Sequence, residues 1–293
     1  MSDRNASRKK TGKVSRRNSL EKYQGLNLNN RIHIPVALHC NMHCNFCDHK
    51  YFCVNETQTR VAVKTLSSGD VLNHLKELTR NVSDDICVAD IAGPGDPFAN
   101  PTETMETIRL IRKQFPDIVI SLSTNGLNVM PYVDELKRLK ISCITITVNA
   151  VESTIGSKIY DWIRLGNNIY RGTKAAELLW DFQQLAIQAL NFREIIVRIN
   201  SLYIPGINSS HIEEIVKSVA SLGASVYNIT PFIPAKSTVF ADLHEPMESE
   251  IIAARELSKH YLPRIDQNLL RKARCSDKNE IKLLSSSAET NKS

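Results

Sequence analysis

From residue 31 onward, short runs rich in Val, Ile and Thr alternate with longer helix-like stretches. Such short runs predict β-strands, and the stretches between them predict helices. We expect strands at 32–38, 86–92, 118–122, 141–148, 194–200 and 225–229. We expect helices at 68–80, 101–114, 131–139, 173–190 and 209–221. This alternation is typical of right-handed βαβ units that build a parallel sheet.

The number of strand–helix units narrows the α/β fold class further. Six units are too few for a complete eightfold barrel, so the sequence predicts a partial (βα)6 barrel of the TIM type. An open doubly wound sheet is the second choice. In both folds, binding and catalytic groups collect where the parallel strands end. Asn100 and Pro101 are expected to begin one helix, as its N-cap and first residue.

The positive charge of the chain is concentrated at one end. The net charge is +6, and residues 1–18 hold seven Lys and Arg residues against Asp3 alone. Without this segment the charge is balanced, so composition supports no nucleic-acid or membrane role. We expect a disordered basic tail at 1–28, the barrel at 29–262 and a mostly loose segment at 263–293.

Targeting and redox signals point to the cytoplasm. No run approaches eighteen apolar residues, and no apolar segment follows the arginine pair at Arg16 and Arg17. A cytoplasmic location is therefore expected. There, seven cysteines are better explained as metal ligands or buried thiols than as disulfides.

Three cysteines are crowded into the loop after the first expected strand. Cys40, Cys44 and Cys47 have the spacing C-x3-C-x2-C. Three thiolates can bind three irons of a [4Fe–4S] cluster and leave the fourth iron open. This spacing, with Phe46 before the third cysteine, is the signature of the radical S-adenosylmethionine (SAM) superfamily. In those enzymes the open iron chelates SAM, and an electron from the cluster splits a carbon–sulfur bond of SAM.

A zinc site is the main alternative for this loop. Cys53 follows Cys47 by six residues and would complete a four-cysteine set. Structural zinc sites usually draw two cysteine pairs from separated segments, which favours the cluster.

Polar residues follow four further strands, where a bound SAM would be reached. Gly93, Gly95 and Asp96 form a Gly-Pro-Gly-Asp-Pro turn, in which glycines allow backbone to approach a ligand closely. Hydroxyl and amide groups suit ribose contacts, and an arginine suits a carboxylate. The remaining expected cofactor-binding residues are Phe46, Ser123, Asn125, Asn149, Arg198 and Asn200.

Beyond the superfamily signature, the sequence resembles the NifB family, the radical SAM enzymes of nitrogenase cofactor biosynthesis. The likeness covers roughly residues 31–245, and it lies in the stretches 31–37, 40–56, 91–97, 123–127, 145–151, 201–208 and 228–234. The resemblance implies fusion of two [4Fe–4S] units into an [8Fe–9S–C] cluster, whose carbon comes from a SAM methyl group. It implies that Cys53 ligates a substrate cluster, that Glu56 is a nearby acid–base group, and that Cys275 is a further cluster ligand.

The resemblance also implies partners. These are SAM, iron–sulfur cluster donors, nitrogenase cofactor-assembly proteins, and a reductant such as ferredoxin or flavodoxin. Nucleic acid and membrane are not expected.

The chain departs from the family at three ligand positions. Residues 15–30 contain no His-Pro-Cys segment, Ser121 stands where the family has a cysteine, and Lys272 stands at the first position of a final cysteine pair. Cys87 and Cys143 lie too far from the strand ends to substitute and are expected to be core thiols. Two other functions therefore stay open: a divergent radical SAM enzyme with another substrate, and a non-catalytic iron–sulfur carrier or scaffold.

Overall fold

A six-stranded parallel sheet forms the centre of the computed structural model, which describes residues 31–48, 68–81 and 88–263. Neighbouring strands of this sheet follow one another in chain order, and the three remaining strands of the described chain form a second, smaller sheet. The strands of the main sheet are β1 (Arg31–Pro35), β3 (Val88–Ala92), β4 (Val119–Thr124), β5 (Cys143–Thr147), β8 (Ile196–Tyr203) and β9 (Val226–Pro231). This sequential parallel order confirms the α/β class and the partial barrel expected from the sequence.

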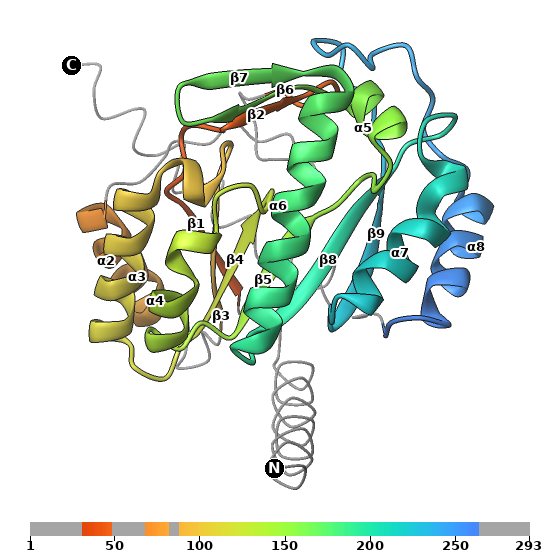
Figure 1. The fold of residues 1–293 in the computed structure, drawn as a ribbon. Helices are drawn as coiled ribbons and strands as arrows, with labels where there is room; N and C mark the ends of the chain where they lie inside the picture. The colour runs from red at the N-terminus through yellow and green to blue at the C-terminus, as the bar shows by residue number, and fades with distance from the viewer. Residues whose placement is uncertain (1–30, 49–67, 82–87, 264–293) are drawn as a thin grey trace, which may run out of the picture.

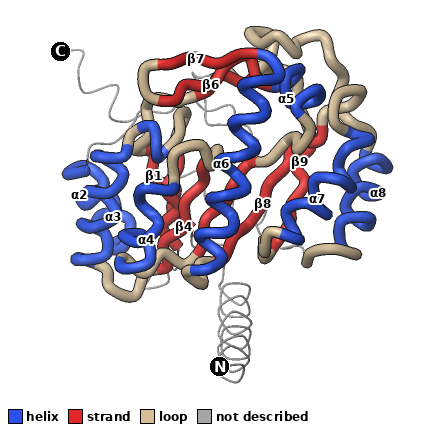
Figure 2. Tube along the Cα trace, viewed as in Figure 1, coloured by secondary structure: helices blue, strands red, loops and turns tan. Residues whose placement is uncertain are grey.

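All helices but α5 lie along one face of this sheet, with α2 and α3 over one end and α7 and α8 over the other, whereas α5 lies beside the upper end of α6 (Figure 1). Figure 2 shows the same separation of helices from strands. The helices are α2 (Ser68–Asn81), α3 (Pro101–Gln114), α4 (Val133–Arg138), α5 (Ser153–Ile159), α6 (Gly172–Phe192), α7 (Ile212–Ser221) and α8 (Glu248–Lys259).

The two faces of the sheet differ sharply in polarity. The face toward the helices carries a row of apolar side chains across five strands, and all of them belong to the main core: Ile34, Ile91, Leu122, Ile144 and Val197. Strand side chains alternate between faces, so the neighbouring rows point to the inside of the partial barrel. Those rows include His33, Asp90, Ser121, Thr145 and Arg198. The interior is thus polar although most of it is buried.

The element boundaries refine the sequence prediction in one place that matters for function. The fifth strand, β8, has eight residues and runs to Tyr203, whereas the sequence predicted its end at Asn200. Arg198 and Asn200 therefore lie within the strand and not at its end. All eight residues of β8 are buried, so burial continues past the polar residues that seemed to mark the end.

The sequence analysis missed a second sheet. Three short antiparallel strands form it, with β6 between β2 and β7, and Figure 1 shows them together above one end of the main sheet. They are β2 (Met42–Cys44), β6 (Tyr160–Leu165) and β7 (Asn168–Arg171). β2 lies inside the cysteine loop, so this small sheet joins the loop to the segment between β5 and α6. A separate apolar cluster that includes Met42, Phe46 and Ile163 packs beneath it.

Several predictions fall on parts of the chain that the structure does not describe. The expected tail at 1–28 and most of the segment 263–293 are among them, as is Cys87. Among the described residues, no helix combines the length and apolar character needed to span a membrane.

Candidate functional site

The cysteine loop begins where β1 ends and crosses the carboxyl edge of the main sheet. Cys40, Cys44 and Cys47 are each partly buried, and Cys44 ends β2. Phe46 is only 1% exposed and packs in the apolar cluster beneath the small sheet. Its ring therefore anchors the loop from below, which gives a structural reason for an aromatic residue before the third cysteine.

The glycine turn after β3 lies directly against this loop. The backbone N–H of Gly95 donates to the carbonyl of Ala37 (2.9 Å), and the N–H of Asp96 donates to the carbonyl of His39 (2.9 Å). A Cβ atom on Gly95 would overlap the carbonyl oxygen of His39, and one on Gly93 would overlap that of Ala37. Glycine is required here because two backbone segments touch. This turn therefore holds the start of the cysteine loop through backbone hydrogen bonds.

Asn100 joins the same contact from the other side. Its Nδ2 donates to the carbonyl of His39 (2.7 Å), and its Oδ1 accepts from the N–H of His39 (3.2 Å). Asn100 is the N-cap residue of α3, as the sequence predicted, but its side chain makes no capping hydrogen bond. The amide is instead used to hold the loop, although Pro101 does begin α3 as predicted.

Asp96 connects the turn after β3 with the turn after β4. Its buried carboxylate accepts hydrogen bonds from the hydroxyl of Thr124 (2.8 Å), the N–H of Asn125 (2.6 Å) and the N–H of Phe98 (2.8 Å). Burial raises the pKa of the Asp96 carboxyl, and these hydrogen bonds oppose that rise. Asp96 thus fixes the position of Asn125 relative to the loop.

Asn125 reaches the cysteines themselves. Its Nδ2 donates to Oδ1 of Asn41 (2.6 Å) and lies 3.9 Å from Sγ of Cys40, while its Oδ1 accepts from the N–H of Leu127 (2.9 Å). Gln183 on α6 donates to the backbone carbonyl of Asn125 (2.8 Å). The sequence predicted Asn125 at this site, and the structure places its amide beside the first cysteine.

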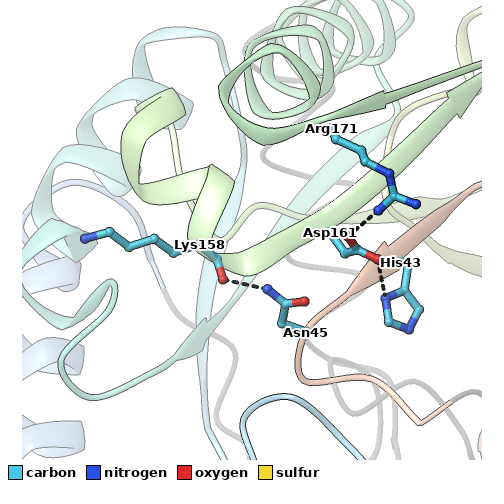
Figure 3. A network of polar contacts seen from close by, with 5 residues as sticks. All are labelled: His43, Asn45, Lys158, Asp161 and Arg171. Carbon is cyan, nitrogen blue, oxygen red and sulfur yellow. Dashed lines mark hydrogen bonds and ion pairs between the residues drawn. The ribbon is translucent and has the colours of Figure 1, made fainter.

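The end of α5 and the small sheet hold the opposite side of the loop (Figure 3). Asn45 donates through its backbone N–H to Ile159 (2.8 Å) and through Nδ2 to the carbonyl of Lys158 (2.8 Å). Asp161 lies between His43 of the loop (3.6 Å) and Arg171 of β7, with which it forms a close ion pair. These contacts are more exposed than those around Asp96.

Asn149 and Tyr160 form a buried pair behind the loop. The backbone N–H of Asn149 donates to the Tyr160 hydroxyl (3.2 Å), and Oδ1 of Asn149 accepts from the N–H of Leu202 (2.8 Å). Burial raises the pKa of the Tyr160 phenol, and negative charge on Cys44 adds to that rise. Nδ2 of Asn149 is buried and makes no well-formed hydrogen bond among the described residues. It lies close enough to the Tyr160 hydroxyl to lower the pKa of that phenol, and it could turn to donate to a ligand.

Arg198 and Asn200 lie on the polar inner face of the sheet. Nε of Arg198 donates to the hydroxyl of Thr145 (2.7 Å), and Asn200 accepts from Thr230 (3.0 Å). Asn228, beside Asn200 in the sheet, has a buried Oδ1 without a partner in the described ranges. Ser123 is buried in the same row as Arg198. Polar groups from four strands therefore face the inside.

Deeper in the interior, Ser121 forms a hydrogen bond within the protein. Its hydroxyl donates to Asp90, whose other carboxylate oxygen lies 3.8 Å from His33. Cys143, the next residue of this row, is fully buried, as expected for a core thiol.

Three predicted functional residues, Cys53, Glu56 and Cys275, lie outside the described ranges. Within those ranges, no three His, Cys, Asp or Glu side chains form a group that could hold a single metal ion. A cubane makes a different demand because each thiolate binds a separate iron. The described donors suit such a cluster in their chemistry, being three soft thiolates on one anchored loop.

Sequence reasoning missed the residues that position the loop. Two of these residues, Asn41 and Asn45, belong to the cysteine loop itself. The other three contact the loop or the residues packed behind it: Asn100, Tyr160 and Asp161. One signal was available: Gly166-Asn167 between two alternating runs is typical of a two-residue hairpin.

Comparison with known families gives one match that spans the site. The model of the radical SAM superfamily matches residues 34–219. Two solved structures are similar to this chain in fold. Streptococcus suis SuiB, bound to the precursor peptide SuiA, has a TM-score of 0.56 at 14% identity, covering 79% of this chain and 45% of its own. Methylornithine synthase (PylB) has a TM-score of 0.54 at 16% identity, covering 83% and 68%. At these identities the likeness concerns the fold alone.

Curated relatives are more similar in sequence. The FeMo cofactor biosynthesis protein NifB of Chlorobaculum tepidum is 41% identical over 235 residues, which are 80% of this chain and 55% of the relative. The protein of the same name from Bradyrhizobium diazoefficiens is 40% identical over 212 residues, which are 72% and 42% of the two chains. The chain spans about half the length of the curated relatives it matches.

Proposed function

We propose that this chain, which belongs to the radical SAM superfamily, cleaves SAM reductively as a step in FeMo-cofactor biosynthesis. The observation that carries the proposal is the anchored cysteine loop at the carboxyl edge of the parallel sheet. The loop that carries the three thiols is contacted there by the amide of Asn125, beside Cys40, and by the glycine turn. In α/β folds, this edge is where ligands bind.

Cys40, Cys44 and Cys47 would hold a [4Fe–4S] cluster, and SAM would bind beside it. When bound, the cluster and SAM supply one-electron cleavage of a carbon–sulfur bond. The protein's own contribution is positioning. Asn125 donates toward the sulfur of Cys40, and hydrogen bonds to ligand sulfurs are one way in which proteins set a cluster's reduction potential.

The polar interior would receive the rest of SAM. Arg198 suits a carboxylate, and Ser123, Asn149 and Asn200 suit hydroxyl and amino groups. The buried Nδ2 of Asn149 supports this assignment, since it makes no well-formed hydrogen bond in the described part of the chain. Gly93, Gly95 and Asp96 would shape the edge of the same site, where the turn after β3 contacts the cysteine loop. Phe46 would hold the loop in place by packing beneath it.

The substrates we propose are two [4Fe–4S] units, fused with a SAM-derived carbide into an [8Fe–9S–C] cluster. Cys53 and Cys275 would be ligands for these units, and Glu56 an acid–base group. The support is the relatives named for FeMo cofactor biosynthesis, at 36–41% identity. Cluster donors, cofactor-assembly proteins and a ferredoxin or flavodoxin would be the partners, in the cytoplasm.

A second candidate rests on Ser121. Its hydroxyl is committed to Asp90 in the interior, and oxygen is a poorer ligand than thiolate for iron–sulfur units. A radical SAM enzyme with another substrate would use the same cysteine loop without binding additional clusters. A non-catalytic iron–sulfur carrier would use the loop without cleaving SAM.

Anaerobic reconstitution distinguishes these functions. We expect the wild-type protein, reduced with dithionite, to release 5′-deoxyadenosine from SAM, and Cys44→Ala to abolish release because one cluster ligand is lost. Cys143→Ala is the matched control, since Cys143 is buried in the main sheet away from the loop. Retained cleavage in Cys44→Ala would refute the cluster assignment.

Metal content then separates the substrates. About twelve irons per chain, the content of three four-iron clusters, would support the cofactor function, and about four would support another substrate. Iron without 5′-deoxyadenosine would identify a carrier. Zinc without sulfide would identify a zinc site.

A further inference from the structure

The small sheet presents an outer face that the proposed chemistry does not use. Its register sets His43, Trp162 and Arg171 side by side on three strands. Arg164 and Ile169, the next pair, share this face because strand side chains alternate. Ile163 and Tyr170 belong to the opposite, core-facing side. The outer face thus combines an aromatic ring, an aliphatic side chain and two arginines.

This face is exposed. Arg164 and Arg171 are exposed, and Ile169 is 49% exposed. The guanidinium of Arg164 lies 5.8 Å from the centre of the Trp162 ring, and the Ile169 side chain is a large apolar group open to solvent. An apolar centre with a charged rim is the usual composition of a transient protein interface.

The charge of this segment is opposite to that of its surroundings. Residues 157–174 contain Lys158, Arg164, Arg171 and Lys174 against Asp161 alone. Elsewhere, the described ranges hold 15 Lys and Arg residues against 21 Asp and Glu residues. Lys158 and Lys174 belong to α5 and α6, and Lys174 pairs with Glu177 (3.3 Å). On the outer face itself, Arg164 and Arg171 stand against Asp161, the partner of Arg171. This small net positive charge, set in an acidic described region, attracts an acidic partner and orients its approach.

The same face leads directly to the cysteine loop. His43 precedes Cys44, and its ring stacks on Trp162 with a centroid separation of 6.2 Å and an interplanar angle of 14°. The backbone N–H of Arg164 donates to the carbonyl of Asn41 in the loop (2.8 Å). The path from the exposed face to the cysteines therefore passes through neighbouring residues of a single sheet.

We propose that the outer face of the small sheet is the docking surface for an acidic one-electron carrier protein. This inference rests on the proposed function, because it assumes a cluster at Cys40, Cys44 and Cys47. In the transfer, the carrier is oxidised by one electron and the cluster is reduced by one electron, with no bond formed or broken. Encounters of this kind use small, electrostatically steered interfaces, for which a charged rim is sufficient.

The test measures binding in addition to turnover. A flavodoxin, used as the acidic carrier, is titrated into the full-length protein with and without reconstituted cluster, at low and high salt. Arg164→Glu should weaken flavodoxin binding roughly fivefold or more at low salt, with little difference at high salt, because exposed charges are screened. Lys113→Glu, an equal charge reversal at the exposed end of α3, should change binding less than about twofold.

A chemical reductant provides the second arm. With dithionite, Arg164→Glu should release 5′-deoxyadenosine at the wild-type rate, whereas with reduced flavodoxin its rate should fall by a factor similar to the loss of affinity. If Arg164→Glu unfolds, Ile169→Glu carries the same test, since it places an acid on the same face. Flavodoxin affinity that is equal in wild type and in both variants would overturn the docking surface. Failure of the wild type to cleave SAM with dithionite would overturn the proposed function instead. A preference of this face for RNA over flavodoxin would also overturn the proposal.

Discussion

The two sides of the cysteine loop are held by different kinds of contact. On the main-sheet side, Gly95, Asp96 and Asn100 fix the loop through buried backbone contacts and hydrogen bonds. On the small-sheet side, Asp161 joins His43 and Arg171 through polar contacts that are roughly half exposed. Buried polar contacts are costly to disrupt, while exposed ion pairs contribute little.

This difference indicates that the two sides of the loop have different roles. The buried side sets where the cysteines lie relative to the strand ends and to Asn125. The exposed side keeps the loop attached to a surface on which charge can be changed with little cost to the fold. Mutations on the two sides should therefore differ in their effect on stability by several-fold.

The largest effect is expected at Gly95. In Gly95→Ala, the new methyl group would overlap the carbonyl of His39, and backbone cannot move aside cheaply. We expect a loss of about 3 kcal/mol or more in the free energy of unfolding, measured by urea denaturation.

The matched control for Gly95 is Gly166 in the hairpin of the small sheet. Its φ is +57°, with no atom within 4 Å of an added Cβ. Gly166→Ala should cost only about 1 kcal/mol, from backbone conformation alone. Equal losses in the two variants would show that the loop and the glycine turn are not in tight contact.

A smaller effect on the same side is expected at Asp96. Asp96→Asn replaces one acceptor oxygen with a donor, so either Asn125 or Phe98 loses a hydrogen bond in a buried position. The expected loss is about 2 kcal/mol in the free energy of unfolding. Asp181→Asn, on the exposed surface of α6, should change it by less than about 0.5 kcal/mol. An Asp96→Asn variant with the free energy of unfolding of the wild type would mean that this carboxyl does not tie the two turns together.

The main sheet could be predicted from the sequence because each strand is a buried, β-branched run followed by a helix. The cysteine loop could be predicted because its spacing is a local pattern. The Asn100 contact could not, since it joins residues 61 positions apart and the local sequence Asn-Pro equally suits a helix cap. Propensity describes neighbours in the chain and carries no information on which loop folds back.

The small sheet was missed for a related reason. β2 has only three residues, and its pairing with β6 comes from a segment more than a hundred residues away. Arg198 was placed at a strand end because polar residues usually mark such ends. In this sheet the described inner face is itself polar, so β8 continues through Arg198 and Asn200 to Tyr203.

The smallest effect is expected for the ion pair of Asp161 and Arg171. Their side chains are 41% and 62% exposed, so water screens the pair and solvates either partner when the other is removed. A double-mutant cycle of Asp161→Asn, Arg171→Gln and both together should give a coupling energy below about 1 kcal/mol, decreasing with added salt. Urea denaturation at low and high salt measures it.

A coupling energy above 2 kcal/mol that is insensitive to salt would place this pair in the same class as the Asp96 contacts, and the contrast between the two sides of the loop would disappear. A small coupling, together with wild-type SAM cleavage under dithionite, would show that the cysteines are positioned from the main sheet and that the small sheet can change its surface charge without moving them.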